Sequence, residues 1–270
     1  MLFLLLLIPF VSASADYDVQ IVTQYLQTYG YLTHDNKTVS SIGVGGNSSS
    51  FQEALIKFQD FFRIEATGEL DNETITIMKK PRCGVKDYPQ SFTLYDTKWK
   101  KNKLGWKFVY GNQQDKSIAE KCFAEWARHT NMTFFMDERK PDIVISYGSV
   151  KHRNFYRCKN SSACPFNLDG PGGVLGHAFF PDSSNNCIEI HLDNTENWFK
   201  EVGTFPPQNY HSLYYTLLHE IGHSLGIEHT GVNTAVMYPS LNDNRKSVEL
   251  DQDDINAIQS LYGLPPVKRR

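Results

Sequence analysis

The chain has 270 residues, of which 40% are hydrophobic and 21% charged, and its formal net charge is -3. This length and composition allow a sizeable core in one or two compact domains and exclude a low-complexity chain. The weakly acidic balance argues against nucleic acid as a partner, because phosphate binding needs a clear basic excess.

The N-terminus has the pattern of a secretory signal. Residues 2–10 are almost wholly apolar, and Ala13, Ser14 and Ala15 follow as a small-residue cleavage site. This run is shorter than the roughly 20 apolar residues that span a bilayer, and no later stretch is long and apolar enough for a membrane helix. We therefore predict a signal peptide of residues 1–15, secretion to the extracellular space or matrix, and no membrane anchor. Five sequons fit that compartment and predict a glycoprotein: Asn36, Asn47, Asn72, Asn131 and Asn160.

Residues 16–80 have helical patterning. Apolar residues recur at three- and four-residue spacings in two stretches, beginning at Val19 and at Phe51, with a Gly/Ser-rich loop over residues 40–50 between them. Asp71 is the expected N-cap of a third, short helix that ends before Pro81. A small helical bundle is predicted, followed by an extended link of residues 81–87, PRCGVKD.

From about residue 92 the pattern changes to short strands and helices. β-Branched and aromatic runs predict strands over 106–110, 142–147, 173–180 and 187–192. Helices are expected over 117–130, 211–225 and 251–262. This order predicts an α+β domain of roughly 170 residues.

The stretch HEIGHSLGIEH, residues 219–229, has the spacing of a metal site. On a helix, His219 and His223 share one face, and Gly226 allows the chain to turn so that His229 supplies a third imidazole. Three neutral imidazoles favour zinc and leave one coordination position open for water. Glu220 is then placed to act as the catalytic general base.

The cysteine count is odd. An oxidising compartment would pair four of the five and leave one, for which Cys83 is the best candidate. Spacing alone leaves three pairings open among the others, which are Cys122, Cys158, Cys164 and Cys187.

These motifs resemble those of the metzincin metalloproteases and, within them, the matrixins, or matrix metalloproteinases. Met237, in AVMYP, is similar to the Met-turn of the family, and Thr230 after His229 resembles matrixins more than adamalysins or astacins. PRCGVKD resembles the matrixin cysteine switch. The resemblance covers nearly the whole chain, to the final LDQDDINAIQSLYG.

The resemblance implies a fold and a domain organisation. We expect a helical propeptide over 16–91, with the switch at 81–87, and a catalytic domain over 92–264 with a mixed five-stranded twisted sheet and three helices. A basic tail over 265–270 would complete a minimal, matrilysin-like form without a hemopexin domain.

The resemblance also implies how the enzyme is kept latent. Cys83 would take the fourth zinc position, and Arg82 and Asp87 would fix the switch loop by charge pairing. Lys86 stands where the family usually has Pro. Activation would cut near residues 90–92, and the freed amine would pair with Asp253.

Two further metal sites follow from the resemblance. The structural zinc site would be formed by His152, His177 and His191, with Asn154 at a position where the family has Asp. The calcium site would comprise Asp169, Gly170, Gly172, Val174, Asp193 and Glu196. An insertion of roughly ten residues between His152 and Asp169 carries Cys158 and Cys164, so we expect these two to pair and Cys122 to pair with Cys187.

The substrate would lie extended beside the strand at 175–180, with Leu175, Ala178, Tyr215 and Pro239 as binding residues. Tyr215 would shorten the pocket on the primed side, which favours an aliphatic residue such as Leu after the cut bond. The expected partners are extracellular protein substrates and tissue inhibitors of metalloproteinases, and a monomer is expected.

Two other interpretations are weaker. An astacin- or adamalysin-type enzyme disagrees with Thr230 and with the switch motif. A catalytically dead metal-binding or inhibitory module would be free to lose Glu220, which is present.

Overall fold

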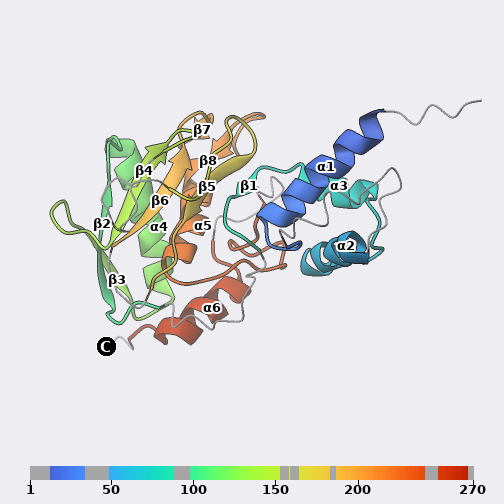
Figure 1. The fold of residues 1–270 in the computed structure, drawn as a ribbon. Coiled ribbons are helices and arrows are strands. Elements are labelled where there is room, and N and C mark those ends of the chain that lie inside the picture. The colour runs from blue at the N-terminus through green and yellow to red at the C-terminus, as the bar shows by residue number, and fades with distance from the viewer. Residues whose placement is uncertain are drawn as a thin grey trace, which may run out of the picture.

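The structure, a computed structural model, describes residues 13–33, 49–87, 98–152, 158, 164–182, 187–240 and 249–266 (Figure 1). Several predicted features lie outside these residues: most of the signal peptide, the sequons at Asn36, Asn47 and Asn160, the activation site, Asn154 and the last four residues of the basic tail. The sequon asparagines Asn72 and Asn131 are exposed. No helix in the described part of the chain is long and apolar enough to cross a membrane.

The N-terminal part is the predicted helical bundle. Its helices are α1 (Ala13–Thr28), α2 (Ser49–Phe61) and α3 (Asn72–Met78). The Asp71 side chain accepts a hydrogen bond from the backbone N–H of Thr74, as expected of an N-cap. Phe58 and Leu26 have no exposed surface and lie in the core between the helices.

The sheet contains six strands in the order β1-β5-β6-β4-β2-β3. They are β1 (Arg82–Cys83), β2 (Lys103–Phe108), β3 (Thr133–Met136), β4 (Ile143–Gly148), β5 (Val174–Ala178) and β6 (Ile188–Asp193). Only β5 and β6 pair antiparallel, so the sheet is mixed, as predicted. Five strands come from the predicted catalytic region, and the sixth, β1, comes from the PRCGVKD segment. Two short strands, β7 (Trp198–Phe199) and β8 (His211–Ser212), pair with each other in a separate two-stranded sheet.

Three helices complete the second part, as expected: α4 (Gln113–Arg128), α5 (Leu213–Ser224) and α6 (Gln252–Tyr262). Every residue of α5 is buried, because this helix packs against both the sheet and α4. The indole N–H of Trp126 on α4 donates to the carbonyl of Leu218 on α5, over 2.9 Å. In Figure 1, the edge strand β1 lies on the side of the sheet that faces the helical bundle.

The disulfide pairing differs from the prediction. Cys158 is bonded to Cys187, whereas Cys83, Cys122 and Cys164 are free thiols, so the expected Cys158–Cys164 and Cys122–Cys187 pairs are wrong. Cys122 is fully buried on α4, where its thiol donates to the carbonyl of Tyr214. Cys187 instead directly precedes β6, beside the Val109–Val144 cluster. Spacing along the chain carries no information about this separation in space.

Candidate metal centre

Helix α5 positions two of the three histidines of the HEIGHSLGIEH stretch. Its N-cap, Ser212, accepts a hydrogen bond from the backbone N–H of Tyr215. His219 and His223 lie one turn apart, and their Nε2 atoms are 3.1 Å from each other. The chain turns at Gly226, whose φ of 96° suits glycine, and then brings back His229. The Nε2 of His229 is 3.1 Å from that of His219 and 3.0 Å from that of His223.

Backbone carbonyls orient the two helical imidazoles. The Nδ1 of His219 is 2.7 Å from the carbonyl oxygen of Val236, and that of His223 is 2.7 Å from the carbonyl oxygen of Ile227. Each contact favours the tautomer whose Nε2 lone pair points to the centre of the cluster. Burial lowers the pKa of His223 and of His229, which keeps both rings in the neutral form that binds metals.

The sulfur of Cys83 completes this cluster. It and the three histidine nitrogens all lie within 4.8 Å of one another. The backbone N–H of Cys83 donates to the carbonyl of Pro239 over 2.9 Å, and that of Gly84 donates to Gly176 on β5 over 2.8 Å. The PRCGVKD segment therefore lies as an added edge strand between β5 and residues 237–240, with its thiol directed at the histidines.

Arg82 and Asp87 form a buried ion pair that holds this segment in place. Arg82 is 2% exposed, and its Nη2 lies 2.5 Å from Oδ1 of Asp87. The guanidinium also donates to the hydroxyl of Tyr25 on α1 and lies 3.4 Å from the ring centroid of Tyr29, which directly follows that helix. The predicted charge pair thus also joins the switch segment to the helical bundle.

Glu220 lies between the helical ligands in sequence and is fully buried. Neither of its carboxylate oxygens has a hydrogen-bond partner within the described residues. Burial raises its pKa to about 8, an effect that the neighbouring thiol of Cys83 opposes. A buried carboxylate without a structural partner, beside a cluster of metal-type donors, has the properties of a general base.

The donor set fits zinc. Three neutral imidazoles and one thiol that converge within bonding reach of a common point are the ligands of a closed, tetrahedral zinc site. With the sulfur removed, the same residues would leave one position open.

Met237 and Asp254 lie next to the histidine cluster and hold the surrounding backbone in place. The sulfur of Met237 would lie only 2.3 Å from a Cβ added at Gly222, so the predicted Met-turn packs directly against α5. The carboxylate of Asp254 accepts the backbone N–H groups of Val236 over 2.7 Å and of Met237 over 3.0 Å. Sequence reasoning missed Asp254 and singled out its neighbour Asp253. The only available signal was the LDQDD run at the start of α6, where two adjacent acids cannot be distinguished.

A second histidine cluster lies where β5 pairs with β6. His177 on β5 and His191 on β6 are paired in register, and their facing nitrogens are 3.0 Å apart. The Nε2 of His152 is 3.3 Å from His177 and 2.9 Å from His191. The three histidines predicted for the structural zinc therefore meet. The fourth donor at this cluster is Cys164, which sequence reasoning had assigned to a disulfide.

The predicted calcium residues also come together. Gly170 N–H donates to Asp193 over 3.2 Å, Gly172 N–H to Glu196 over 2.7 Å, and Val174 N–H to Asp169 over 2.7 Å. Burial raises the pKa of the Asp169 and Glu196 carboxyls, and the charge of Asp193 adds to both shifts. Crowded carboxylates among backbone turns fit a hard cation such as calcium.

The predicted substrate-binding residues are partly brought together. Leu175, Tyr215 and Pro239 line a cavity of about 20 Å³ beside Cys83 and Glu220. The Tyr215 hydroxyl donates to the carbonyl oxygens of Ala235 and Val236, at 3.3 Å each. Ala178 instead packs in the main core.

Comparison with known proteins places the chain in a family. The matrixin profile matches residues 98–263, and a profile described as a putative peptidoglycan binding domain matches residues 15–78. The interstitial collagenase of Sus scrofa is 35% identical over 260 residues, which are 93% of this chain and 51% of the relative. That of Bos taurus is 37% identical over 260 residues, with the same shares of each chain. Stromelysin-1 of Rattus norvegicus is 33% identical over 267 residues, 95% of this chain and 52% of the relative. The chain thus spans about half the length of these relatives.

The mixed sheet, its three helices and two converging histidine clusters, each with one cysteine, have the donor sets of a metalloprotein. Because the matrixin profile covers more than half of the sequence, the chain belongs to the matrixin family. This is a family of zinc-dependent metalloendopeptidases that also use calcium. The family resemblance, the fold class and the two metals expected from the sequence are thereby confirmed.

Proposed function

We propose that this protein is the latent form of a secreted zinc endopeptidase that hydrolyses extracellular matrix or other extracellular proteins. In this proposal residues 16–91 are the propeptide and residues 92–264 the catalytic domain. The observation that carries it is the position of the Cys83 thiol against His219, His223 and His229, next to the buried and unpaired Glu220. A hydrolytic centre that is complete except for access by water is what a zymogen requires.

The mechanism assigns a task to each group of the chain. Bound zinc would polarise the scissile carbonyl and lower the pKa of bound water to about 7. Glu220 takes the proton from the attacking water and delivers it to the nitrogen of the leaving amine. The edge of β5 is bonded to the switch segment, through Gly84 and Gly176 for example, and is freed when that segment leaves. An extended substrate would then pair along the same edge.

Three features of the switch segment keep the enzyme latent. Cys83 occupies the position that water needs, and β1 occupies the substrate edge. The Arg82–Asp87 pair holds both of them to α1. Extracellular proteins are the proposed substrates, and tissue inhibitors of metalloproteinases the proposed protein partners of the activated form.

The test is cleavage of a quenched Pro-Leu-Gly-Leu-type peptide by the purified chain, before and after an organomercurial that reacts with Cys83. We expect no cleavage before treatment, cleavage after it, and loss of cleavage with a zinc chelator. The matched variant is Glu220→Ala, which should bind the same amount of zinc and remain inactive after treatment. If the parent binds zinc but cleaves no peptide in any condition, the protein is instead a metal-binding module without catalysis.

A further inference from the structure

The second histidine cluster contains a ligand of a chemical type that the sequence did not predict for it. The Sγ of Cys164 is 3.2 Å from Nε2 of His177 and 3.5 Å from Nδ1 of His191. It belongs with these two rings and His152 to a group whose donor atoms all lie within 4.8 Å of one another. We propose that the Cys164 thiolate is the fourth ligand of a closed His₃Cys zinc site, in place of the oxygen ligand expected at Asn154.

The backbone brings Cys164 to this cluster independently of its side chain. The N–H of Cys164 donates to the carbonyl of His152 over 3.4 Å, so these two residues lie side by side although they are 12 positions apart in the sequence. The ring of Phe166, two residues further on, packs 5.1 Å from that of His177. Cys164 therefore reaches the cluster from a segment that is itself packed against it.

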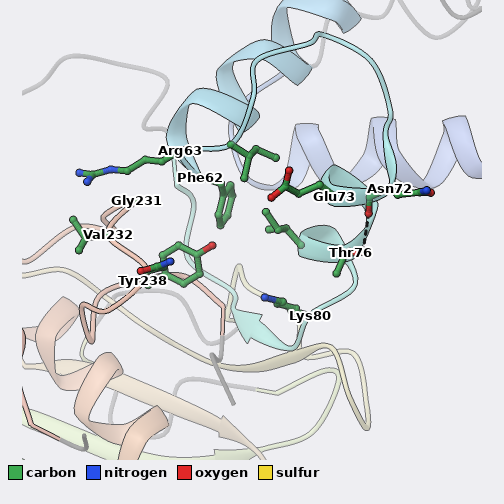
Figure 2. A pocket seen from close by; sticks show the side chains of 12 residues that line it. Phe62, Arg63, Asn72, Glu73, Thr76, Lys80, Gly231, Val232 and Tyr238 are labelled. Atoms are coloured by element: carbon green, nitrogen blue, oxygen red, sulfur yellow. Dashed lines mark hydrogen bonds between the residues drawn. The ribbon is translucent and has the colours of Figure 1, made fainter. Parts of the chain in front are cut away.

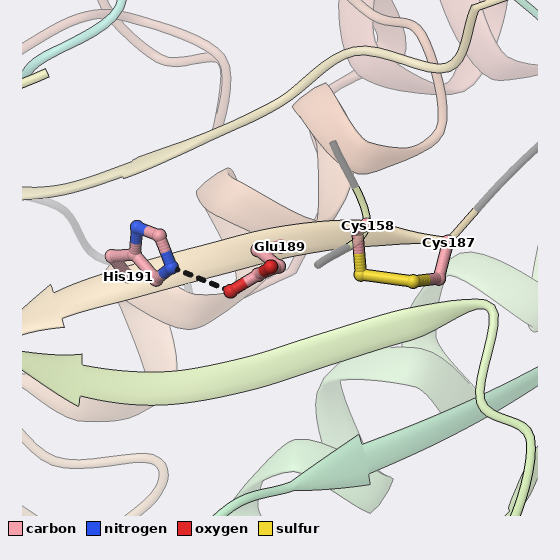
Figure 3. The surroundings of a disulfide bond; sticks show 4 residues. All are labelled: Cys158, Cys187, Glu189 and His191. Carbon is pink, nitrogen blue, oxygen red and sulfur yellow. Dashed lines mark hydrogen bonds and ion pairs between the residues drawn. A yellow bond between two sulfur atoms is a disulfide. The ribbon is translucent and has the colours of Figure 1, made fainter. Parts of the chain in front are cut away.

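The disulfide attaches the same insertion to the strand that carries His191. Cys158 is bonded to Cys187, just before β6, and Figure 3 shows this bond beside Glu189 and His191 on β6. The four strand steps from Cys187 to His191 cover about 13 Å. The six residues from Cys158 to Cys164 can span about 20 Å when extended. The disulfide at Cys187 is thus compatible with a position of Cys164 at His191.

The surroundings suit a metal with one anionic ligand. His191 uses its other nitrogen to contact a Glu189 oxygen at 3.0 Å, and His152 contacts the Ser149 carbonyl oxygen, also at 3.0 Å. These contacts leave the inward nitrogens as donors. The charges of a thiolate and of the Glu189 carboxylate together balance that of Zn²⁺, which matters because Glu189 and His191 are about 1% exposed or less. On binding, the S–H bond of Cys164 breaks and the proton passes to solvent.

The experiment must separate Cys164 from Cys83, since both would be thiolate ligands. All variants are made in the full-length Glu220→Ala protein, so that none can process itself and peptidase activity plays no part in the readout. Zinc is exchanged for cobalt(II), whose bond to a thiolate gives a near-ultraviolet charge-transfer band that imidazole and carboxylate ligands do not give. Cobalt content is measured on the same samples.

The decisive variant adds Cys83→Ala. We expect it to bind two cobalt ions per chain, one for each cluster, and to keep about half of the thiolate band. Adding Cys164→Asp should abolish the band while both ions stay bound, because a carboxylate can replace the thiolate. Adding Cys164→Ala should lower the affinity for the second ion at least about tenfold, as measured by competition with a chelator. Adding Cys122→Ala is the matched control, since that thiol is buried against Tyr214, and should leave the band unchanged.

Two results would overturn the proposal. One is a Cys83→Ala protein that holds two cobalt ions without any thiolate band. The other is a Cys83→Ala protein that holds a single ion and shows no band. Neither result bears on the proposed peptidase activity, which is tested with Glu220 intact.

Discussion

Asp87 of the switch segment contacts His229 of the histidine cluster: its Oδ1 lies 2.8 Å from the ring Nδ1. The same carboxylate pairs with Arg82 and accepts the hydroxyl of Tyr31 from the helical bundle. One side chain thus joins the bundle, the switch and a proposed zinc ligand, which makes it a sensitive point for latency.

We expect Asp87→Ala to activate spontaneously. It leaves the buried guanidinium of Arg82 unpaired, and breaking such a pair costs about 3–5 kcal/mol. The measurement is peptide cleavage without organomercurial, together with the Tm of the Glu220→Ala zymogen. The exposed neighbour Lys86 offers the control, because Lys86→Ala should stay latent. An Asp87→Ala protein that is equally latent and equally stable would contradict this role.

Gly231 is predicted to be needed only in the latent form. A Cβ at this position would lie 1.8 Å from the carbonyl oxygen of Phe61, at the end of α2. The contact lies beside a crevice of about 610 Å³, which Figure 2 shows between the bundle and the 231–233 loop. Gly231→Ala should therefore push the propeptide away and speed up activation by the organomercurial. Val232→Ala, which shortens a side chain lining the same crevice, should not speed up activation.

The activated Gly231→Ala enzyme is the second control. Because the obstacle belongs to the propeptide, kcat/KM after complete activation should equal that of the parent. A loss of kcat/KM there would mean that Gly231 acts on the catalytic centre itself.

Local patterns explain what the sequence could predict. The HEIGHSLGIEH stretch sets its geometry through the helical period and one turn, so three ligands and the base follow from spacing alone. The bundle helices and the inner strands were found in the same way. Strand β3 was missed because it lies at the sheet edge and is partly or fully exposed, which leaves it without a strong apolar pattern.

The features that could not be predicted from the sequence depend on contacts between distant segments. Cys164 meets His177 of β5, and Cys158 is bonded to Cys187 before β6, so both contacts join positions that are well separated in the sequence. Asp254 reaches the Met-turn across the packing of α6. In each case the residue type was visible in the sequence, but its partner lay on an element whose position only the tertiary structure defines.

Tyr215 is expected to limit the length of the side chain accepted after the cut bond. Its ring helps to line the small cavity beside Glu220, and its hydroxyl is bonded to the carbonyls of Ala235 and Val236. Tyr215→Leu should raise kcat/KM for peptides with long aromatic residues at that position relative to Leu. Tyr215→Phe keeps the ring and should retain the aliphatic preference. Equal cleavage of both peptide types by the parent would refute the assignment.

Calcium removal is expected to lower the stability of the chain. Burial, together with the neighbouring charge of Asp193, raises the pKa of the Asp169 and Glu196 carboxyls, and a bound cation would stabilise their charged forms. A calcium-selective chelator should lower the Tm of the Glu220→Ala zymogen, and readdition of calcium should restore it. Asp169→Asn should reduce this response, whereas Glu201→Gln, an exposed carboxylate further along the chain, should not.

Asp254 and Asp253 are adjacent but are predicted to act at different stages. Asp254 is 1% exposed and bonds the backbone N–H groups of Val236 and Met237, so Asp254→Ala leaves two buried donors without partners. We expect it to lose about 3 kcal/mol or more of unfolding free energy in the zymogen, measured by denaturant titration. Asp253→Ala should change zymogen stability by less than about 0.5 kcal/mol.

After activation, Asp253 should become important, because the new N-terminus is then present. If the freed amine pairs with Asp253, then Asp253→Ala should lower the Tm and kcat/KM of the activated enzyme while leaving the zymogen intact. Asp253→Asn separates charge from size, because it keeps the shape and removes the ion pair. An activated Asp253→Ala enzyme with the parent's Tm and kcat/KM would show that the amine finds another partner. Asp254 would then be the only one of the two acids that supports the centre.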